Sequence, residues 1–585
     1  MENVISCTCQ RWKQRPFDHS KLAKMIQQHG LPDVLAKAML ARGVNPDDFS
    51  SYVSPKLASN LPDPSLIADM DRAADRIAAA IIKGEHIFVY GDYDVDGATS
   101  TSLIYMFLKD AGAKQVSVRI PERNEGYDAD SESMKEAWNA GASLVITVDC
   151  GTTAFEAIET AKELGMDVVV IDHHEQAEHL PPADAIVNPK VAGQSREGPF
   201  LHLAAVGVVF MVTIAVSRAL RNFGWYDQRK EPDLKQYLDL VALGTVCDVV
   251  KLIGVNRLFV KAGTLIASQN TRVGLKVLSQ ILNITQPLST YHFGFVIGPR
   301  INAGGRVGPS SLGFRLLTAV SEAEALSVAK ELDELNLKRR EIEAAVMYQT
   351  INQIEAQDLG DAKFIMAIGD NWQQGVVGIV AGRLRERYGL PSLVVTVEDG
   401  KAKGSGRSID GIDLGSIIIA AAKEGIITDG GGHSMAVGFS FDIANADKFR
   451  QFLDKSIQQQ LNGEDIQQTI EYDAIVAARA VNLKTASQLK ALEPYGAGNE
   501  EPAFVIQNAL VNNATIVGSG HVRCVIKGVD GGSVRAIAFR AADSALGKVL
   551  LENRGEPLHI MGKMRLDNWN QRETVTFNIL DIARA

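Results

Sequence analysis

Short apolar segments alternate with amphipathic ones through the first third of the chain. The apolar segments are residues 86–90, 115–120, 144–148 and 167–171, and the helical ones include residues 99–111 and 155–164. Runs that are apolar at every position are typical of strands buried on both faces, as in a parallel sheet covered by helices. The pattern therefore predicts an α/β domain built on a parallel sheet.

The pattern changes after residue 200. Apolar helical stretches occupy residues 202–223 and 233–248, and residues 321–356 combine apolar positions at helical spacing with a charged opposite face. We interpret this last stretch as one long connecting helix, with two shorter helices separated by a break as the alternative. A second α/β pattern runs from residue 363 to about 460. Short β-like segments with glycine turns follow it and predict a small β-barrel.

At 585 residues the chain is too long for one hydrophobic core. We expect a fold of the α/β class with an added β-barrel. The predicted segments are an N-terminal helical region at 1–60, a catalytic α/β domain at 61–320, a connecting helix at 321–357, a smaller α/β domain at 358–460 and the barrel at 465–585.

The composition is that of an ordinary globular protein, with 46% hydrophobic and 22% charged residues. We find no stretch long and apolar enough to cross a bilayer, and no apolar segment near the N-terminus that is typical of a signal peptide. We therefore expect a cytoplasmic protein without membrane contact. Among the five cysteines only Cys7 and Cys9 have a spacing that could bind a metal ion, and no second ligand pair accompanies them. We therefore expect reduced thiols, with metal binding by this pair as the alternative.

The net charge of −10 argues weakly against a nucleic-acid partner, because phosphate binding needs positive potential. Charge is nevertheless unevenly distributed, and basic residues outnumber acidic ones in residues 503–585. Phe539 and Trp569 in this region are candidates for stacking on bases. Burial of both side chains in the barrel core is the alternative.

Acidic residues follow the predicted strands at the points where they end. Asp92, Asp94 and Asp96 come directly after the first strand; the third and fourth strands are followed by Asp149 and by the triplet Asp172, His173 and His174. The carboxyl ends of parallel strands meet at one edge of the sheet, which is where open α/β sheets place their sites. Asp248 ends the second apolar helical stretch. We expect all these side chains to converge on one crevice.

The residue types indicate which ligand this crevice binds. Several carboxylates with one or two imidazoles suit Mn²⁺ or Mg²⁺, and they suffice for two ions that share a carboxylate and activate a water molecule. Without metal, so many carboxylates would repel one another strongly. An EF-hand calcium loop starting at Asp92 is excluded, because its twelfth residue is Leu103 and not glutamate, and because the loop follows a strand. The pattern predicts a metal-dependent phosphoesterase.

The acidic motifs also resemble a known family. Asp92 to Gly97, Val148 to Gly151, Asp172 to His174 and Gly244 to Asp248 are similar, in this order, to the four motifs of the DHH phosphoesterase superfamily. Gly430 to His433 resembles the DHHA1 domain that follows DHH domains. Further segments are similar to the RecJ family, bacterial exonucleases that act 5′→3′ on single-stranded DNA. These segments are Ile120 to Tyr127, Gly298 to Arg306, Gly404 to Ser408 and Leu492 to Pro502.

The resemblance implies DHH and DHHA1 domains joined by a long helix, an OB-fold that grips single strands, and release of 5′-mononucleotides with two Mn²⁺ or Mg²⁺ ions. It implies direct metal binding by Asp94, Asp96, Asp149, His173 and Asp248, with Asp149 bridging the ions. Asp92 would complete the shell of the first ion, Asp172 would orient its neighbours, and His174 would contact the scissile phosphate.

The resemblance also implies the residues that hold the substrate's phosphates. Arginine forks match phosphate oxygens without reading the base sequence. The candidates are Arg123, Arg300, Arg306, Ser405 and Arg407, with Ser405 and Arg407 in a terminal-phosphate pocket. Gly431 and Gly432 would offer backbone N–H groups beside His433, with a tight turn as the alternative role of the glycine run. Asp128 and Lys251 depart from the family pattern beside two motifs, so local loop geometry there is open.

Three functions fit the residues so far. The first is a 5′→3′ exonuclease on single-stranded DNA in recombination and repair, working beside single-strand-binding protein and a helicase, as a monomer. The second is a phosphodiesterase for short oligoribonucleotides or cyclic dinucleotides, whose DHH–DHHA1 members lack a C-terminal barrel. The third is a nucleic-acid-binding scaffold without activity, which loss of ligand residues would indicate. No ligand residue is lost here, and the first function is the prediction.

Overall fold

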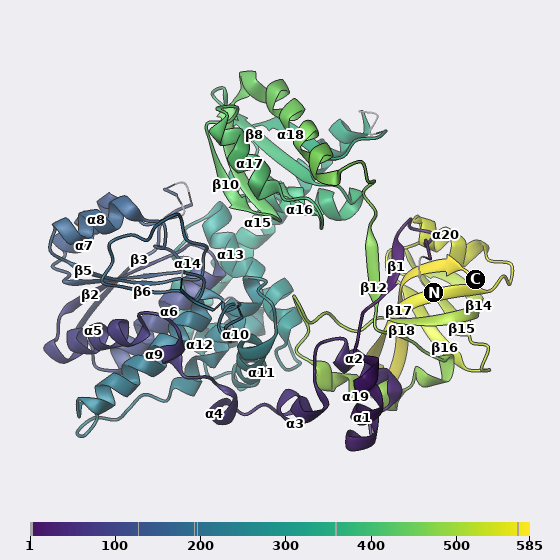
Figure 1. Cartoon of the computed structure of the whole chain (residues 1–585), viewed down its shortest axis with the longest axis horizontal. Coiled ribbons are helices and arrows are strands. Elements are labelled where there is room, and N and C mark those ends of the chain that lie inside the picture. The colour runs from purple at the N-terminus through teal and green to yellow at the C-terminus, as the bar shows by residue number, and fades with distance from the viewer. Residues whose placement is uncertain are drawn as a thin grey trace. The chain divides into compact units, whose positions relative to one another are not determined.

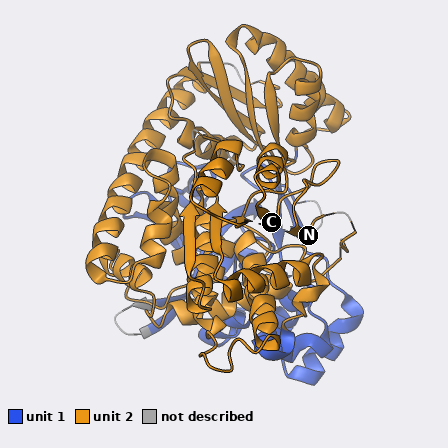
Figure 2. Cartoon of the chain, turned by 90° about the vertical axis from the view of Figure 1, so that its left-hand side faces the viewer, with its two compact units in different colours: residues 1–60, 467–585 blue, residues 61–466 orange. Residues whose placement is uncertain are grey.

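The computed structural model describes residues 4–585 except Asn124, Tyr127, Ala192, Arg196, 357–359 and 570–571, and it leaves the side chains of 568–572 undescribed. Trp569, a predicted stacking residue, thus lies outside the described side chains. The chain forms two compact units: residues 61–466, and residues 1–60 together with 467–585 (Figure 2).

A five-stranded parallel sheet organises the first half of residues 61–466. Its strand order is β3-β2-β4-β5-β6, and each neighbouring pair is parallel. The strands are β2 (His86–Gly91), β3 (Gln115–Arg119), β4 (Leu144–Val148), β5 (Asp167–Ile171) and β6 (Ala185–Val187). The four predicted strands are confirmed to within a residue, because each is a run of apolar side chains that the sheet buries.

Helices cover both faces of this sheet (Figure 1). On one face α7 (Ser131–Asn139) and α8 (Phe155–Glu163) pack against the strands; on the other lie α5 (Met70–Lys83), α6 (Val95–Asp110) and α9 (Ala205–Asn222). Helix α6 begins four residues before the prediction because Asp94 caps it. Helix α7 was not predicted; it buries only Ser133, Met134 and Ala137, too few positions to give an apolar period.

Helix α9 corrects one expectation. Its 18 residues are long and apolar enough to cross a membrane, contrary to the prediction that no such stretch exists, but 78% of that window is buried inside the molecule. Here apolar character reflects a core position between α5, α6 and α10 (Leu238–Cys247).

A helical region follows and ends in one long helix. Helix α15 runs without a break from Glu322 to Glu355, so the alternative of two shorter helices is wrong. Its first half packs against the preceding helices, and its second half contributes Val346 and Ile354 to the core of the next α/β layer. The preceding elements are α11 (Gly254–Ala267), α12 (Val273–Ile281), a π-helix (His292–Ile297), α13 (Gly298–Val307) and α14 (Leu312–Thr318).

A second sheet, of order β10-β11-β9-β8-β7, completes this unit; only β7 and β8 pair in parallel. Its elements are β7 (Ile365–Asp370), α16 (Gln374–Tyr388), β8 (Ser392–Glu398), β9 (Lys401–Arg407), α17 (Leu414–Lys423), β10 (Asp429–His433), β11 (Ala436–Asp442) and α18 (Ala446–Leu461). Helix α16 packs against α15, β8 and β9, while α17 and α18 contribute to the core on these strands.

The other unit is a closed β-barrel with the N-terminal helices packed against it. β14, β15, β16, β18 and β17 pair in this order, and β17 pairs back with β14. The elements of residues 467–585 are β12 (Thr469–Tyr472), β13 (Ala474–Ile475), α19 (Leu483–Leu489), β14 (Phe504–Val517), β15 (His521–Lys527), β16 (Ser533–Ala538), α20 (Ala545–Glu552), β17 (Leu558–Trp569) and β18 (Arg572–Arg584). The predicted fold class, α/β with a β-barrel, is confirmed.

Residues 1–60 share the barrel's core, an association that the sequence pattern did not indicate. Leu35 and Met39 pack with barrel residues such as Phe504, and the buried Arg42 guanidinium pairs with Asp473. Strand β1 pairs with β12 in parallel. The N-terminal elements are β1 (Arg11–Gln14), α1 (His19–His29), α2 (Asp33–Leu40), α3 (Phe49–Val53) and α4 (Leu57–Asn60). The cysteines are free thiols, as expected.

Candidate metal centre

The loop after β2 presents the first group of carboxylates. Asp94 caps α6 by accepting a hydrogen bond from the Gly97 backbone N–H at 3.0 Å. A Cβ at Gly97 would lie 2.4 Å from the backbone oxygen of Asp92, so only glycine allows this close turn. Asp92 and Asp96 are buried on either side of it. The turn thereby brings three carboxylates to the carboxyl end of β2.

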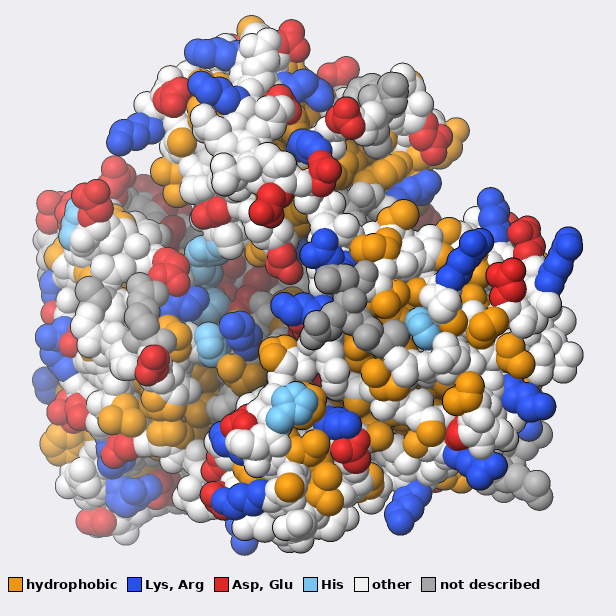
Figure 3. All heavy atoms as spheres, turned by 45° about the vertical axis from the view of Figure 1, so that its right-hand side comes forward, with side chains coloured by type: hydrophobic (Ala, Val, Ile, Leu, Met, Phe, Trp, Pro, Cys, Tyr) orange, Lys and Arg blue, Asp and Glu red, His pale blue; other side chains and the backbone are white. Residues whose placement is uncertain are grey.

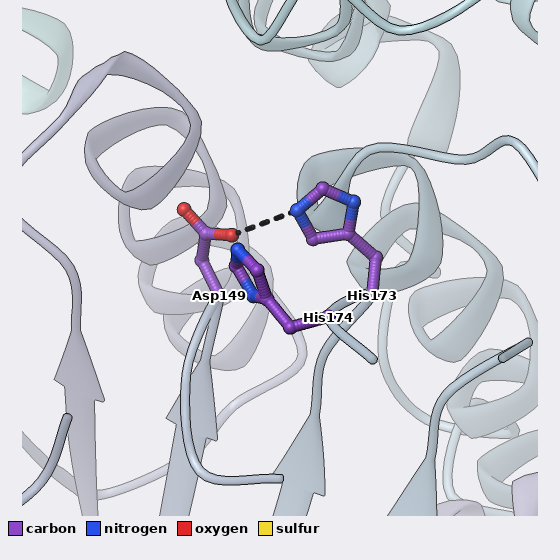
Figure 4. A group of neighbouring side chains, drawn as sticks. All are labelled: Asp149, His173 and His174. Atoms are coloured by element: carbon purple, nitrogen blue, oxygen red, sulfur yellow. Dashed lines mark ion pairs between the residues drawn. The ribbon is translucent and has the colours of Figure 1, made fainter. Parts of the chain in front are cut away.

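Asp149 stands at the carboxyl end of the neighbouring strand β4. Its φ of 62° is in the left-handed region, where residues other than glycine are uncommon. The Nε2 atom of His173, after β5, lies 3.3 Å from Asp149 Oδ1, and Figure 4 shows this pair together with His174. The same nitrogen lies 3.7 Å from Asp248 Oδ2 and 3.9 Å from Asp96 Oδ2. Asp248 does not follow a strand; it is the C-cap residue of helix α10. The predicted convergence of these residues is therefore observed.

The potential ligand atoms form three overlapping groups, in each of which all atoms lie within 4.8 Å of one another. The groups are Asp92, Asp94 and Asp149; Asp96, His173 and Asp248; and Asp149, His173 and His174. Because the first two groups share no residue and Asp149 contacts members of both, the arrangement has room for two cations with Asp149 between them. His174, predicted to contact the phosphate, belongs to the third group and so also lies where it could bind a metal ion.

Buried atoms without a partner fit a cation. Among the described residues, nothing donates a hydrogen bond to Asp92 Oδ1 or Asp248 Oδ2, although both oxygens are inaccessible to water. Burial, and then the charges of neighbouring aspartates, raises the pKa of Asp92, Asp149 and Asp248 well above the usual range. Carboxylates that suffer this penalty together are the oxygen donors that Mn²⁺ and Mg²⁺ neutralise.

The imidazole in the centre is neutral. Burial and the neighbouring His174 lower the pKa of His173 to about 3. A neutral imidazole is the form that binds a metal ion. Its Nε2 atom points at the carboxylates, so the side chain is ready to act as a ligand without first losing a proton.

Asp172 lies beside the centre and orients its two histidines. Its Oδ1 accepts hydrogen bonds from His174 Nδ1 at 2.7 Å and from the His173 backbone N–H at 2.7 Å, and its Oδ2 accepts one from the Thr152 backbone. Burial opposes the charged carboxylate, but the His174 hydrogen bond and charge outweigh it and hold the pKa of Asp172 below its usual range. Burial lowers the pKa of His174, but the hydrogen bond and charge of Asp172 outweigh burial, so the pKa is raised above its usual value.

Asp96 is held by a contact that sequence reasoning missed. Its two oxygens accept hydrogen bonds from the backbone N–H groups of Ala205 and Val206 at 2.7 and 3.0 Å, at the start of α9. A Cβ at Gly244 would come within 3.0 Å of Asp96 Oδ1 and 2.3 Å of the Thr99 hydroxyl. The glycine in the Gly244-to-Asp248 motif thus makes room for Asp96. Only the packing of α10 against α6 reveals this.

Asp128, one of the two departures from the family pattern, fastens the loop after β4. Its Oδ1 accepts a hydrogen bond from the Gly151 backbone at 2.8 Å, and its Oδ2 accepts one from the Thr153 hydroxyl at 2.7 Å. The substitution therefore stabilises the turn that carries Asp149.

The predicted arginines divide into two sets. Burial, and the nearby charges of Arg123 and Arg339, lower the pKa of Arg306 to about 10, while Asp94 opposes this effect. Arg123 also stacks over the Tyr93 ring, 4.2 Å from its centroid. Both side chains therefore lie beside the first acidic loop. Arg300 instead pairs through Nε with Asp333 of α15 at 2.8 Å and donates from Nη1 to the Val296 carbonyl.

The second sheet supplies the remaining candidates. Arg407 donates to the Ser405 hydroxyl at 3.0 Å, and both side chains face α16, where a Cβ at Gly378 would lie 3.0 Å from each. Gly431 and Gly432 belong to the edge strand β10, so the tight-turn alternative is wrong at these two positions. His433 ends this strand; burial, then Lys190 and His174, lower its pKa. Lys190, whose charge partly offsets the rise in the pKa of Asp248, was not predicted.

Comparison with known proteins matches three segments. Residues 86–245 match the DHH family N-terminal domain, residues 361–459 the DHHA1 domain and residues 472–581 the RecJ OB domain. The single-stranded-DNA-specific exonuclease RecJ of Bacillus subtilis (strain 168) is 32% identical over 98% of this chain and 71% of the relative. The chain belongs to the RecJ family. The predicted family is therefore confirmed.

Other RecJ proteins support the same assignment. RecJ of Escherichia coli (strain K12) is 33% identical over 88% of this chain and 90% of its own. The crystal structure of RecJ in complex with Mn²⁺ from Thermus thermophilus superimposes with a TM-score of 0.81 at 28% identity, covering 98% of this chain and 79% of that one. A structure of RecJ from the same organism in complex with Mg²⁺ gives a TM-score of 0.76 at 26% identity, covering 98% of this chain and 78% of that one.

Proposed function

We propose that this RecJ-family chain is an exonuclease that degrades single-stranded DNA 5′→3′ and releases 5′-mononucleotides by metal-dependent hydrolysis. One observation carries the proposal: two groups of potential ligands, most of them buried, meet at Asp149 in a chain of this family. A scaffold without activity would have no need of these carboxylates. The match to the RecJ OB domain favours a long single strand as substrate over a cyclic dinucleotide.

The residues divide the work as follows. Asp92, Asp94, Asp96, His173 and Asp248 would hold two Mn²⁺ or Mg²⁺ ions, with Asp149 between the two ions. When bound, such ions lower the pKa of a water molecule and neutralise charge on the phosphate. Asp172 fixes the ring of His174 through its Nδ1 atom. His174 would contact the scissile phosphate. The raised pKa of His174 favours the protonated ring that donates to a phosphate oxygen.

The proposed substrate path uses the basic residues of the same unit. Arg123 and Arg306 lie beside the metal loop and would bind backbone phosphates, and Arg300 would contribute its remaining N–H groups. Ser405 and Arg407, with the backbone of Gly431 and Gly432 and the His433 ring, would receive the terminal 5′-phosphate. Figure 3 shows histidine side chains (pale blue) beside acidic ones (red) on the surface of residues 61–466.

The barrel would hold the strand farther from the cleaved end. The outward face of β15 and β16 carries Arg523, Lys527 and Arg535, and Phe539 at its end is 57% exposed. Its ring meets His521 edge-on at 5.2 Å. Phe539 therefore fits the stacking role better than the core alternative. We further propose that the protein acts in recombination and repair in the cytoplasm. It would work as a monomer beside single-strand-binding protein and a helicase.

The test replaces Asp149. Asp149→Asn should abolish Mn²⁺-dependent release of mononucleotides from a 3′-labelled single strand, while the melting temperature with chelator does not fall below that of the wild type. Asp447→Asn makes the same chemical change at an exposed position of α18 and should retain activity. Undiminished release by Asp149→Asn would refute the metal assignment, and immediate release of the 3′ label by the wild type would refute the 5′→3′ direction.

A further inference from the structure

An exposed pair of aromatic rings stands on the π-helix at residues 292–297. Tyr291, just before it, is 63% exposed, and Phe295 within it is 75% exposed. The two rings stack, with centroids 5.6 Å apart and planes 27° from parallel. No role assigned so far uses these side chains. A π-helix is rare and is frequently found at functional sites.

The inner side of this turn packs on the end of α10, next to the metal centre. Phe293 and Ile297 are buried, and the Cys247 thiol donates to the Phe293 carbonyl at 3.5 Å. At Gly298 a Cβ would lie 2.4 Å from Cys247 Sγ, so the turn lies directly on the end of α10. The next residue is Asp248, a candidate ligand. The aromatic pair is thus carried by a segment that contacts the residue before the metal ligand.

Arg300 holds the turn from the other side. Its Nη1 donates to the Val296 carbonyl at 2.7 Å, and its Nε pairs with Asp333 of α15 at 2.8 Å. These contacts tie the π-helix to α13 and α15. The turn is therefore rigid, and its exposed rings are preorganised, which lowers the entropy lost when a flat ligand stacks on them.

We propose that Tyr291 and Phe295 form a stacking platform for the bases of the single strand near the scissile phosphate. The inference rests on the proposed function and identifies positioning residues for it. Every nucleobase has an apolar face, so a ring platform binds any sequence, as an exonuclease requires. The bases of a duplex already stack on their neighbours on both sides. The platform would therefore favour single strands over duplex.

The experiment compares a normal single strand with one that carries abasic residues near its 5′ end. The wild type should have a lower KM for the normal strand, because only that strand can stack. Tyr291→Ala/Phe295→Ala should raise the KM for the normal strand by roughly tenfold to a hundredfold and should leave the KM for the abasic strand nearly unchanged. The single variant Phe295→Trp keeps an aromatic ring and should bind the normal strand with a KM near that of the wild type. The fluorescence of the introduced indole should be quenched when the normal strand binds.

The controls separate this inference from the proposed function. Tyr348→Ala removes an equally exposed tyrosine (68%) from α15 and should leave both KM values unchanged. The kcat for the abasic strand, which offers no ring near its cleaved end, reports on the metal centre and should be equal in wild type and double variant. If the wild type degrades single strands but the double variant discriminates normal from abasic strands as well as the wild type does, the platform is refuted. If the wild type hydrolyses neither substrate, the proposed function fails instead.

Discussion

Asp248→Asn tests the idea that the centre is electrostatically strained without metal. The substitution keeps the shape of the side chain and removes one negative charge. Asp248 and Asp96 have potential ligand atoms within 4.8 Å of each other. Two unit charges at that separation repel by about 3 kcal/mol at an effective dielectric constant of about 20. Asp248→Asn should therefore stabilise the chelated protein at pH 8 by about that amount, although it removes a proposed ligand.

The pH dependence has a definite sign. Burial and the neighbouring Asp94 raise the pKa of Asp96 to about 7, and Asp92, Asp149 and Asp248 shift in the same direction. A raised carboxylate pKa means that the folded state retains protons that the unfolded chain has released. The stability this provides is complete below the unfolded pKa near 3.8 and is lost as pH rises through the folded pKa. The chelated wild type should thus weaken between about pH 4 and pH 7.

The assay is thermal unfolding with chelator or with Mn²⁺, at pH 5 and pH 8. With chelator at pH 8, Asp248→Asn should melt a few degrees above the wild type, and the difference should shrink at pH 5, where the carboxylates hold protons. Mn²⁺ should raise the melting temperature of the wild type more than that of the variant. Asp447→Asn should melt like the wild type in every condition. A variant that is less stable than the wild type with chelator at pH 8 would contradict the reasoning.

Three further predictions concern the substrate. Asp172→Asn should lower the pKa of His174, because it removes the charge that raises it, and should shift the alkaline limb of the kcat–pH profile to lower pH; an unmoved limb would argue against His174 as a proton donor. Arg407→Ala should reduce the preference for a 5′-phosphorylated over a 5′-hydroxyl strand by about tenfold to a hundredfold, and Arg407→Lys should have an intermediate effect. If wild type and both variants show the same preference, Arg407 does not bind the terminal phosphate. Residues 61–466 expressed alone should fold and cleave short strands with near-normal kcat but bind long strands more weakly than the whole chain. Equal affinity of both proteins for long strands would show that the barrel does not bind the strand.

Local patterns allowed much of the site to be predicted. The strands before Asp92, Asp149 and Asp172 are apolar runs, and each strand ends where its apolar run ends. Parallel strands have their carboxyl ends at the same edge of the sheet. The side chains that follow them must therefore meet, whatever the details of packing. The resemblance to the family then predicted which of these residues bind metal and which support them. For this reason the acidic groups, the sheet and the barrel were all predicted from the sequence.

Contacts between distant segments depended on the tertiary structure. Asp96 is anchored by the start of α9 and accommodated by Gly244, and neither contact leaves a periodic signal in the sequence. Arg300 is largely occupied by Asp333, a partner 33 residues away on another helix. Residues 1–60 pack with a barrel that begins only after the whole of the other unit.

The sequence by itself determined which chemical groups gather at the end of the sheet, because strand period and strand ends are local properties. Only the tertiary structure decided how each group is held, which ones lack a hydrogen-bonding partner among the described residues, and where the stacked rings of Tyr291 and Phe295 stand relative to the end of α10. Those features depend on the packing of helices over long sequence separations, and a one-dimensional pattern does not encode that packing.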